Sequence, residues 1–319
     1  MTNEIGINDI VFNNNGIDTV SLIASYKTVL GMLERNGIEL KENNKHTPIN
    51  PYVSDLEKRL GGDEKKRYKK ESFKPFVQYA KLSNGTGLSN YLIILRNTPT
   101  LFDYAIDNKK AKDFYCMVIF SGLHQPTKTI TNDNLKLISK FVKRKCFKLY
   151  SVDIASDFNS PTQINYRAKD EVKTRLLSHT DPKGFYLLGS SLYCNRVNDK
   201  SISKLLLYDK FHKQKTHQKQ PLNDDLNQWK RMEITIKPRA KTDFKSYVLS
   251  RDFRDVLGEF STMGATLNPL QVSNGYLYLQ LKALFDNRVL NGKQNKERFN
   301  TITNISRLKN VGFDEVVRR

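Results

Sequence analysis

The sequence contains few cysteines and no long hydrophobic run, and both absences exclude classes of protein. Only three cysteines, Cys116, Cys146 and Cys194, occur in 319 residues, and no two of them form a Cys-x-x-Cys pair. A disulfide framework and a structural zinc site are therefore not expected. The apolar segment "NYLIIL" (90–95) has the length of a strand rather than of a bilayer-spanning helix. Because the N-terminal residues resemble neither a signal peptide nor a transit peptide, we expect a cytoplasmic protein without a membrane segment.

Acidic residues are scarce relative to basic ones. The chain has 53 Lys and Arg residues against 33 Asp and Glu residues, which gives a formal net charge of +20. Such a charge attracts polyanions, of which nucleic acids and anionic membranes are the usual ones. We expect nucleic acid to be the partner. A basic protein with merely soluble surfaces is the alternative reading of the charge.

Hydrophobic periodicity predicts an α+β protein without internal repeats. Apolar residues recur at helical spacing in 18–40, 131–145, 252–260, 274–290 and 299–317. Strand patterns occupy 90–97, 114–122, 148–158, 203–210 and 230–237. We expect an antiparallel sheet with a polar face, flanked by helices and followed by a helical C-terminal part.

The same patterns predict a division of the chain near residue 240. Residues 1–240 form the expected α+β domain, within which 41–75 is a basic, linker-like stretch. Residues 241–319 form the expected helical C-terminal region, a candidate accessory DNA-binding part.

Three of the predicted strands carry polar side chains at alternate positions. Alternate residues of a strand face opposite sides of its sheet. In 230–237, for example, Arg231 and Glu233 share one face while Met232 and Ile234 share the other. If the three strands are neighbours in one antiparallel sheet, a single face carries Asp153, Tyr208, Lys210, Arg231 and Glu233.

The carboxylates on this face are candidate ligands of a divalent cation. Asp153 and Glu233, from neighbouring strands, are the better oxygen pair for Mg²⁺ or Mn²⁺. Asp157 is a third candidate, but it lies about 13 Å along an extended strand from Asp153, so the two share an ion only if the strand breaks. The alternative is that these are ordinary solvent-facing strand residues.

Tyr208 stands where an apolar strand gives way to a basic segment, which makes it a candidate nucleophile. A phenol with an ordinary pKa of about 10 is a poor nucleophile at neutral pH. A metal ion on a substrate phosphate, with Lys210 on the same face, would stabilise the developing negative charge. An active site and a wet sheet face both remain open from the alternation alone.

Four segments together resemble a known family of replication initiators. They are, in the family's order, "SVDIASDF" (151–158), "FYLLGSS" (185–191, a Gly-Ser strand), "LLLYDK" (205–210) and "RMEITIK" (231–237). The family is the Rep_trans group, found in rolling-circle plasmids and filamentous phages. The chain departs from the family pattern at Ser151, where the family has arginine. Residues 1–140 and 240–319 carry no matching motif.

The resemblance implies an enzyme that nicks and rejoins one DNA strand at a replication origin through a 5′-phosphotyrosyl link. Tyr208 would be the nucleophile, Asp153 and Glu233 would hold Mg²⁺ or Mn²⁺, and Lys210 and Arg231 would contact the phosphate. The implied partner is origin DNA, as duplex or hairpin and as single strand. A host helicase and a homodimeric assembly are further expectations.

Two further interpretations follow from the basic segment and from the choice of function. The lysines after Tyr208 are expected to contact the DNA backbone, with a solvated loop as the alternative: Lys213, Lys215 and Lys219. A relaxase for conjugative mobilisation would use the same chemistry, and a non-catalytic DNA-binding protein is the rival from another class. Carboxylates that face phosphate repel it unless a cation lies between them, which favours the enzyme.

Overall fold

One antiparallel sheet organises the molecule. The structure, a computed structural model, describes residues 4–42, 77–82, 91–96, 115–124, 133–217, 221–268 and 273–286. Within these ranges ten strands form a single sheet, whose order is β2 (Lys41–Glu42), β3 (Val77–Leu82), β4 (Tyr91–Arg96), β5 (Tyr115–Ser121), β1 (Asn15–Ser25), β6 (Lys148–Asn159), β10 (Trp229–Ile236), β9 (Ile202–Asp209), β8 (Ser191–Cys194) and β7 (Phe185–Leu188).

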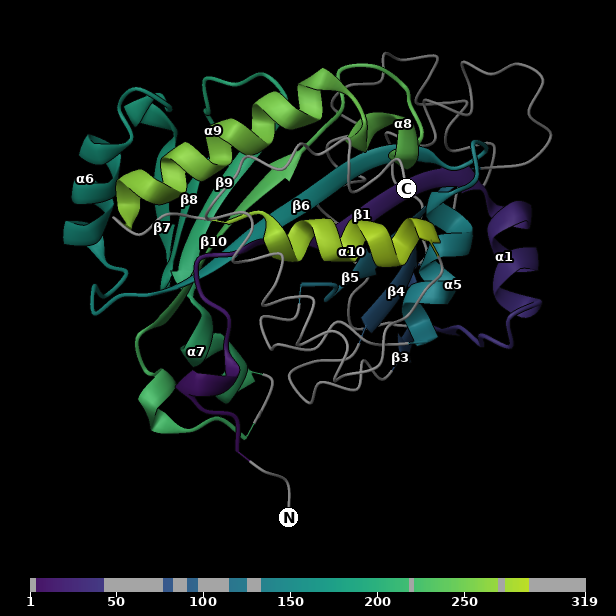
Figure 1. Ribbon diagram of the computed structural model, residues 1–319, viewed down its shortest axis with the longest axis horizontal. Coiled ribbons are helices and arrows are strands. Elements are labelled where there is room, and N and C mark those ends of the chain that lie inside the picture. The colour runs from purple at the N-terminus through teal and green to yellow at the C-terminus, as the bar shows by residue number, and fades with distance from the viewer. Residues whose placement is uncertain are drawn as a thin grey trace, which may run out of the picture.

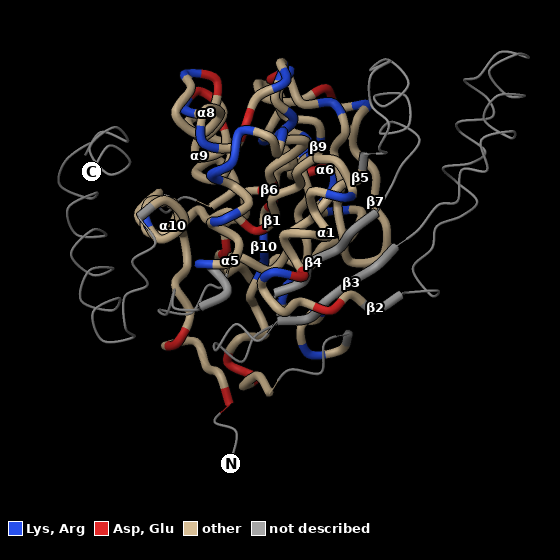
Figure 2. The backbone as a smooth tube through the Cα atoms, turned by 90° about the vertical axis from the view of Figure 1, so that its right-hand side faces the viewer, with Lys and Arg blue, Asp and Glu red and all other residues tan. Residues whose placement is uncertain are grey.

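Helices cover one face of this sheet. They are α1 (Tyr26–Glu34), α5 (Asp133–Val142), α6 (Tyr166–Arg175), α8 (Phe244–Val248), α9 (Arg251–Leu267) and α10 (Gly275–Asp286). The short helix α7 (Lys210–His212) lies apart from them, next to the rings of Tyr208 and Trp229. Helices α9 and α10 cross in front of the long central strands in Figure 1. In the view turned by 90°, α8, α9 and α10 lie together on one side of the strands (Figure 2). The opposite side of the central strands carries the polar residues described below.

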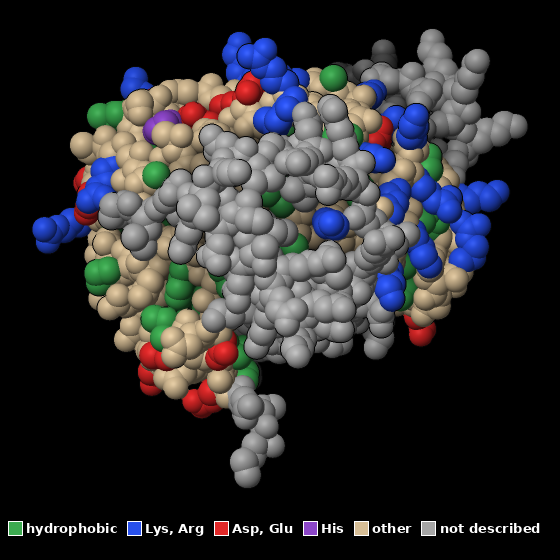
Figure 3. All heavy atoms as spheres, in the orientation of Figure 1, with side chains coloured by type: hydrophobic (Ala, Val, Ile, Leu, Met, Phe, Trp, Pro, Cys, Tyr) green, Lys and Arg blue, Asp and Glu red, His purple; other side chains and the backbone are tan. Residues whose placement is uncertain are grey.

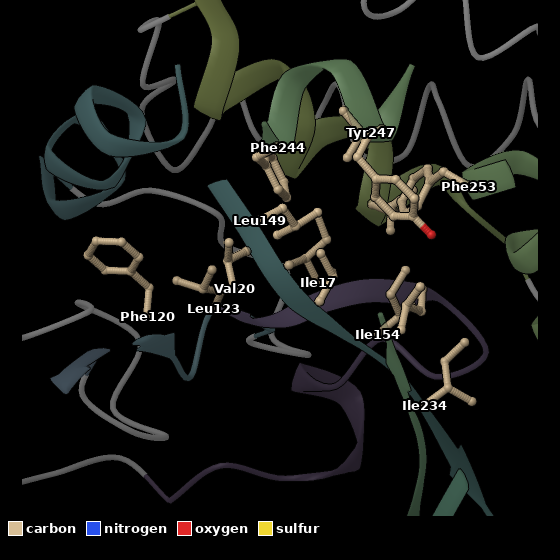
Figure 4. Packing of buried hydrophobic residues seen from close by; sticks show 14 of the residues in the cluster. Ile17, Val20, Phe120, Leu123, Leu149, Ile154, Ile234, Phe244, Tyr247 and Phe253 are labelled. Carbon is tan, nitrogen blue, oxygen red and sulfur yellow. The ribbon is translucent and has the colours of Figure 1, made fainter. Parts of the chain in front are cut away.

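The core lies between the central strands and the helices that follow residue 240. Phe244 and Phe253 face the strand residues Ile154 and Ile234 in Figure 4, and all four side chains belong to one buried cluster. Helix α9 contributes residues at the i, i+3, i+4 spacing of an amphipathic helix. The described helices after residue 240 therefore share a core with the sheet.

The α+β prediction is confirmed, and so are the three polar-faced strands, which correspond to β6, β9 and β10. The helix predicted for 18–40 is wrong in its first half, where the chain forms β1. In that stretch Val20, Leu22 and Ala24 are buried with a period of two, and the sheet supplies neighbours on both sides. Helix α1 begins only after Ser25, whose hydroxyl accepts a hydrogen bond from the Thr28 backbone N–H at 3.2 Å.

The segment 185–191, expected as one strand, is a hairpin. Strand β7 ends at Leu188 and β8 begins at Ser191. Gly189 lies between them with a φ of +58°, a left-handed conformation that glycine adopts without steric cost. The hairpin places two short strands at one edge of the described sheet. The predicted helix at 299–317 lies outside the described residues. So does the basic stretch predicted for 41–75, except for Lys41–Glu42, which form β2.

In the part of the chain that the structure describes, no helix combines the length and the apolar character needed to span a bilayer.

Truncation of Phe260 tests the shared core. Its side chain is fully buried in α9, so Phe260→Ala should lower the free energy of unfolding by about 3–5 kcal/mol, measured by urea denaturation. The exposed Leu177 gives the control, since Leu177→Ala should change stability by less than about 0.5 kcal/mol. Equal losses in the two variants would contradict the packing of α9 against the sheet.

Candidate active site on the sheet

The neighbouring strands β6, β10 and β9 bring the predicted polar residues to one face. Across the β10–β6 ladder Arg231 lies opposite Asp157, and across the β10–β9 ladder it lies opposite Tyr208. Two residues further along β10, Glu233 lies opposite Ala155 on one side and Leu206 on the other. Since side chains directly opposite one another in a sheet share a face, the register groups these residues without any distortion of the strands.

Tyr208 and Glu233 are joined by a hydrogen bond. The Tyr208 hydroxyl donates to Glu233 Oε2 at 3.2 Å. Tyr208 is buried, with 3% of its surface exposed. Burial, followed by the negative charge of Glu233, raises the pKa of Tyr208 well above its ordinary value. The phenol is therefore protonated, and a carboxylate already accepts its proton in a hydrogen bond.

Asp153 and Glu233 are two carboxylates held in an environment that disfavours their charge. Burial and the nearby Glu233 raise the pKa of Asp153 to about 7. Burial, followed by the charge of Asp18, raises the pKa of Glu233 as well. Asp153 Oδ1 is buried without a hydrogen-bond partner. A buried carboxylate oxygen without a partner is costly, and a cation beside it would remove that cost.

The pair fits a hard divalent cation, with the protein supplying a minority of the ligands. Among the described residues no group of three or more His, Cys, Asp and Glu side chains is placed to hold a metal ion. Mg²⁺ commonly binds through one or two carboxylates and completes its shell with water and substrate phosphate. Asp153 and Glu233 match that donor set.

Arg231 is the most heavily engaged side chain of the face. Its Nε and one terminal nitrogen donate to Asp157 at 2.9 and 2.8 Å, and its other terminal nitrogen donates to Asp18 at 2.9 Å. Burial would lower the pKa of Arg231, but Asp157 and Asp18 raise it, so the guanidinium stays charged. Its nitrogens are used inside the protein, so the structure favours a positioning role over the predicted contact with phosphate.

Asp157, a candidate metal ligand in the sequence, is placed differently. Its Oδ1 accepts from Trp229 Nε1 at 2.7 Å as well as from Arg231, and its Oδ2 lies 2.7 Å from His124 Nε2. Burial would raise the pKa of Asp157, but Arg231 and His124 hold it well below the usual range. Both oxygens are occupied by protein donors, and the strand is continuous between Asp153 and Asp157, so we remove Asp157 from the candidate metal site.

His124 reaches Asp157 because a glycine leaves room for its ring. A Cβ atom at Gly16 would lie 2.0 Å from His124 Nδ1. Burial lowers the pKa of His124, so the ring is neutral and serves as a hydrogen-bonding residue. His124 therefore has a structural role in this network.

Asp18 belongs to the face although the sequence analysis did not select it. It lies on β1 at a register shift between Ile17 and Thr19, and its partner Arg231 comes from β10, two strands away. The sequence analysis did not select Asp18 because it predicted a helix for 18–40. As a strand, the same residues show Asp18 as the one acidic position in a buried apolar run, which is the signal that could have found it.

The two residues after Tyr208 fix how the chain leaves the strand. Asp209 caps α7 by accepting from the His212 backbone N–H at 2.7 Å, and it forms an ion pair with Lys230 at 2.8 Å. Lys210 is buried, with its Nζ 6.0 Å from the centre of the Tyr208 ring. Burial, followed by the charge of Arg231, lowers the pKa of Lys210 to about 7. Lys210 therefore lies beside the phenol in a dry environment, with its protonated and neutral forms both populated near pH 7.

The basic segment after Tyr208 divides into different roles. Lys213 is exposed, and its Nζ lies 4.6 Å from the centre of the Tyr208 ring. Lys215 forms an ion pair with Asp224, and Lys219 lies outside the described residues. On the face shown in Figure 3, Lys and Arg gather over α1 and α5, while acidic side chains gather on the part below the sheet that carries α7.

No protein-family model matches the sequence, and no curated protein matches it significantly. Among solved structures the chain is similar to a rolling circle replication initiator protein from Geobacillus stearothermophilus. The identity is 14% and the TM-score 0.28, over 76% of this chain and 80% of that one. A TM-score this low does not establish a shared fold, so we base the proposed function on the residues of the site.

Removal of the Asp157 charge should destabilise the protein strongly. Asp157→Asn leaves Arg231 buried without its bidentate partner, and breaking such a buried pair costs about 3–5 kcal/mol. Asp18 is the matched control, because its side chain is 17% exposed and bonds to Arg231 through one nitrogen only. Chemical denaturation should show the smaller loss for Asp18→Asn; the reverse order would contradict the assigned anchor.

The pKa of Asp153 predicts a pH-dependent stability difference. Its value of about 7 in the folded protein lies above the ordinary 3.8, so ionisation disfavours the folded state as pH rises between these values. In a chelating buffer the Tm of Asp153→Asn minus that of the wild type should be near zero at pH 4, grow up to pH 7 and then level off. A difference that does not vary with pH would contradict the buried, charge-disfavouring environment of Asp153.

Proposed function

We propose that this protein is a metal-dependent DNA strand-nicking and strand-joining enzyme that initiates rolling-circle replication at an origin. The observation that carries the proposal is the Tyr208 hydroxyl, held 3.2 Å from Glu233 and on one sheet face with Asp153. The face thus combines a nucleophile, a proton acceptor and a pair of cation ligands. The ordered motifs that resemble the Rep_trans group support the same reaction.

In the proposed step Tyr208 Oη attacks a phosphorus atom of the DNA backbone. A bond forms between Tyr208 and the 5′-phosphate, and the bond from phosphorus to the 3′-oxygen breaks. The phenol proton passes to Glu233 Oε2, which accepts it in the hydrogen bond already present, and the leaving 3′-oxygen takes up a proton from water to become a hydroxyl. One phosphodiester replaces another, so the reverse reaction rejoins the strand.

Asp153 and the second oxygen of Glu233 would hold the cation, Mg²⁺ or Mn²⁺. The bound cation would supply a positive charge for the phosphate oxygens during attack. Without it, the carboxylates of this face would repel the phosphate that the reaction must bring to Tyr208. The partnerless Asp153 oxygen and the raised pKa values of both carboxylates support this assignment.

The cations around Tyr208 have separate parts in the proposal. Lys213 is exposed and contacts the phenol ring, so it can move with an incoming strand and pair with its phosphate. Lys210 is a buried basic side chain near the same ring and would add a positive charge in its protonated form. Arg231 joins β10 to β6 and β1 through its ion pairs with Asp157 and Asp18. A mobilisation relaxase would share this chemistry, whereas a protein that only binds DNA would be hindered by the carboxylates of Asp153 and Glu233 on its binding face. A host helicase and a homodimeric assembly stay predictions of the resemblance.

Substitution of the nucleophile tests the proposed reaction. Tyr208→Phe removes one hydroxyl and keeps the ring, so the variant should fold and bind DNA but fail to nick a supercoiled plasmid that carries the neighbouring origin in Mg²⁺. Wild-type protein should give a nicked product whose gel shift is sensitive to protease. Tyr166→Phe is the control, since Tyr166 is 70% exposed on α6. Wild-type nicking by Tyr208→Phe would rule out the assigned nucleophile.

Metal binding can be tested without activity. Mn²⁺ should raise the Tm of the wild-type protein and should raise it much less in Asp153→Asn and Glu233→Gln, because an amide keeps the shape but loses the charge that holds a hard cation. Asp170→Asn changes an exposed carboxylate on α6 and should keep the full response. Equal Mn²⁺ responses in all four proteins would contradict the two-carboxylate site.

A further inference from the structure

The face that carries Tyr208 continues across two more strands to the edge of the described sheet. Ser191 of β8 lies opposite Tyr208, and Leu188 of β7 lies opposite Ser191. Two residues further along these strands, Tyr193 and Tyr186 lie opposite each other. Alternation therefore puts both tyrosines on the face of Tyr208 rather than on the helix-covered face.

The residues of these strands that face the helices are already sufficient to hold the hairpin. Leu192 and Leu207 are buried in the main core, and Phe185 and Leu187 pack against it. The packing of the hairpin thus does not explain why its outer face is apolar. Leu188 is 67% exposed and Tyr186 46%, which makes them two of the most exposed large hydrophobic side chains in the described part of the chain.

Tyr186 and Tyr193 form a flat, ordered pair. Their ring centres are 5.0 Å apart and their planes differ by 6°, which is a stacked arrangement. Because Tyr193 covers one side of the Tyr186 ring, the exposed part of that ring lies on its other side and rim. A planar aromatic ligand would extend the stack at low entropic cost, since the two rings already support each other.

We propose that Tyr186 and Tyr193 form a stacking platform for unpaired bases of the DNA strand whose phosphate is placed at Tyr208. This inference rests on the proposed function for the position of the phosphate. Two strand spacings and two residues separate the Cα atoms of Tyr208 and Tyr186, about 12 Å in all. That distance is three to four nucleotides at the duplex rise of about 3.4 Å and fewer in an extended strand.

Cations stand near both ends of the path between the two sites, which suits a single nucleic-acid strand. Lys213 lies over the Tyr208 ring, and Lys204 faces the same side of β9 as Tyr208. Surfaces that bind single strands without sequence preference combine such cations for the backbone with aromatic rings for the bases. Every base has a π-face, so the platform would hold a strand whatever its sequence and leave origin recognition to other residues.

The test measures binding of a fluorescent oligothymidylate to proteins in the Tyr208→Phe background, without divalent cation, so that nicking has no influence. Tyr186→Ala should weaken binding about tenfold, from the stacking of one base on one ring, while Tyr186→Phe should keep near-wild-type affinity. Leu177→Ala removes an exposed apolar side chain from the segment that connects α6 to β7, and it should leave the affinity unchanged. The Tm of each variant confirms that it is folded.

A second arm changes the DNA instead of the protein. Removal of the base from the nucleotide that stacks on Tyr186 should weaken binding of the oligonucleotide to the protein that retains Tyr186. The same abasic oligonucleotide should bind Tyr186→Ala about as well as the intact one does, since that variant already lacks the ring. The slope of affinity against salt should be unchanged by Tyr186→Ala, because no phosphate contact is lost.

Three results would overturn the platform. They are unchanged single-strand affinity in Tyr186→Ala, an equal loss for single-strand and duplex DNA, or a loss confined to self-association measured by sedimentation, which would make the patch a protein interface. Failure of the proposed reaction is a separate result, because it appears in plasmid nicking by wild-type protein and not in these binding measurements.

Discussion

The buried ion pair between Arg231 and Asp157 is the interaction on which the candidate site depends. It joins β10 to β6 on the face that carries Tyr208, with both side chains almost completely buried. Asp18 extends it to β1, and Trp229 and His124 satisfy the remaining oxygen positions of Asp157. Because buried charges are tolerated only when they are paired and hydrogen-bonded, this network admits one arrangement of the three strands. Tyr208 then lies opposite Arg231, with Glu233 within reach of its hydroxyl.

The environment of Asp153 and Glu233 is the opposite of that of Asp157. Asp157 is compensated by its donors and keeps its charge, whereas burial and nearby negative charge (Glu233 for Asp153, Asp18 for Glu233) raise the pKa values of Asp153 and Glu233. One sheet face thus holds a saturated carboxylate that builds the structure and two under-compensated ones that are suited to a cation. This contrast between environments distinguishes residues of the same type, which a motif cannot do.

Sequence alternation was sufficient to predict the shared face of β6, β9 and β10, because a period of two and an antiparallel sheet leave little freedom in where the side chains point. It could not predict Asp18, since the apolar spacing of β1 also fits a helix until the flanking strands are known. It could not separate Asp157 from Asp153 either. That difference comes from Trp229 and His124, which are far from β6 in sequence and reach Asp157 only in the folded chain. The sequence analysis did not predict the hairpin at 185–194, because Gly189 and Ser190 are compatible with either a strand or a turn.

The central claim, that Tyr208 becomes covalently attached to DNA, can be measured directly by mapping the attachment site. Wild-type protein would be incubated with Mg²⁺ and a single-stranded oligonucleotide containing the origin nick site, digested with trypsin and nuclease, and analysed by mass spectrometry. The account predicts a nucleotide adduct on the peptide that begins at Leu205 and ends at Lys210, with the modification on Tyr208. An adduct on any other tyrosine, or cleavage of the strand without a covalent intermediate, would contradict it.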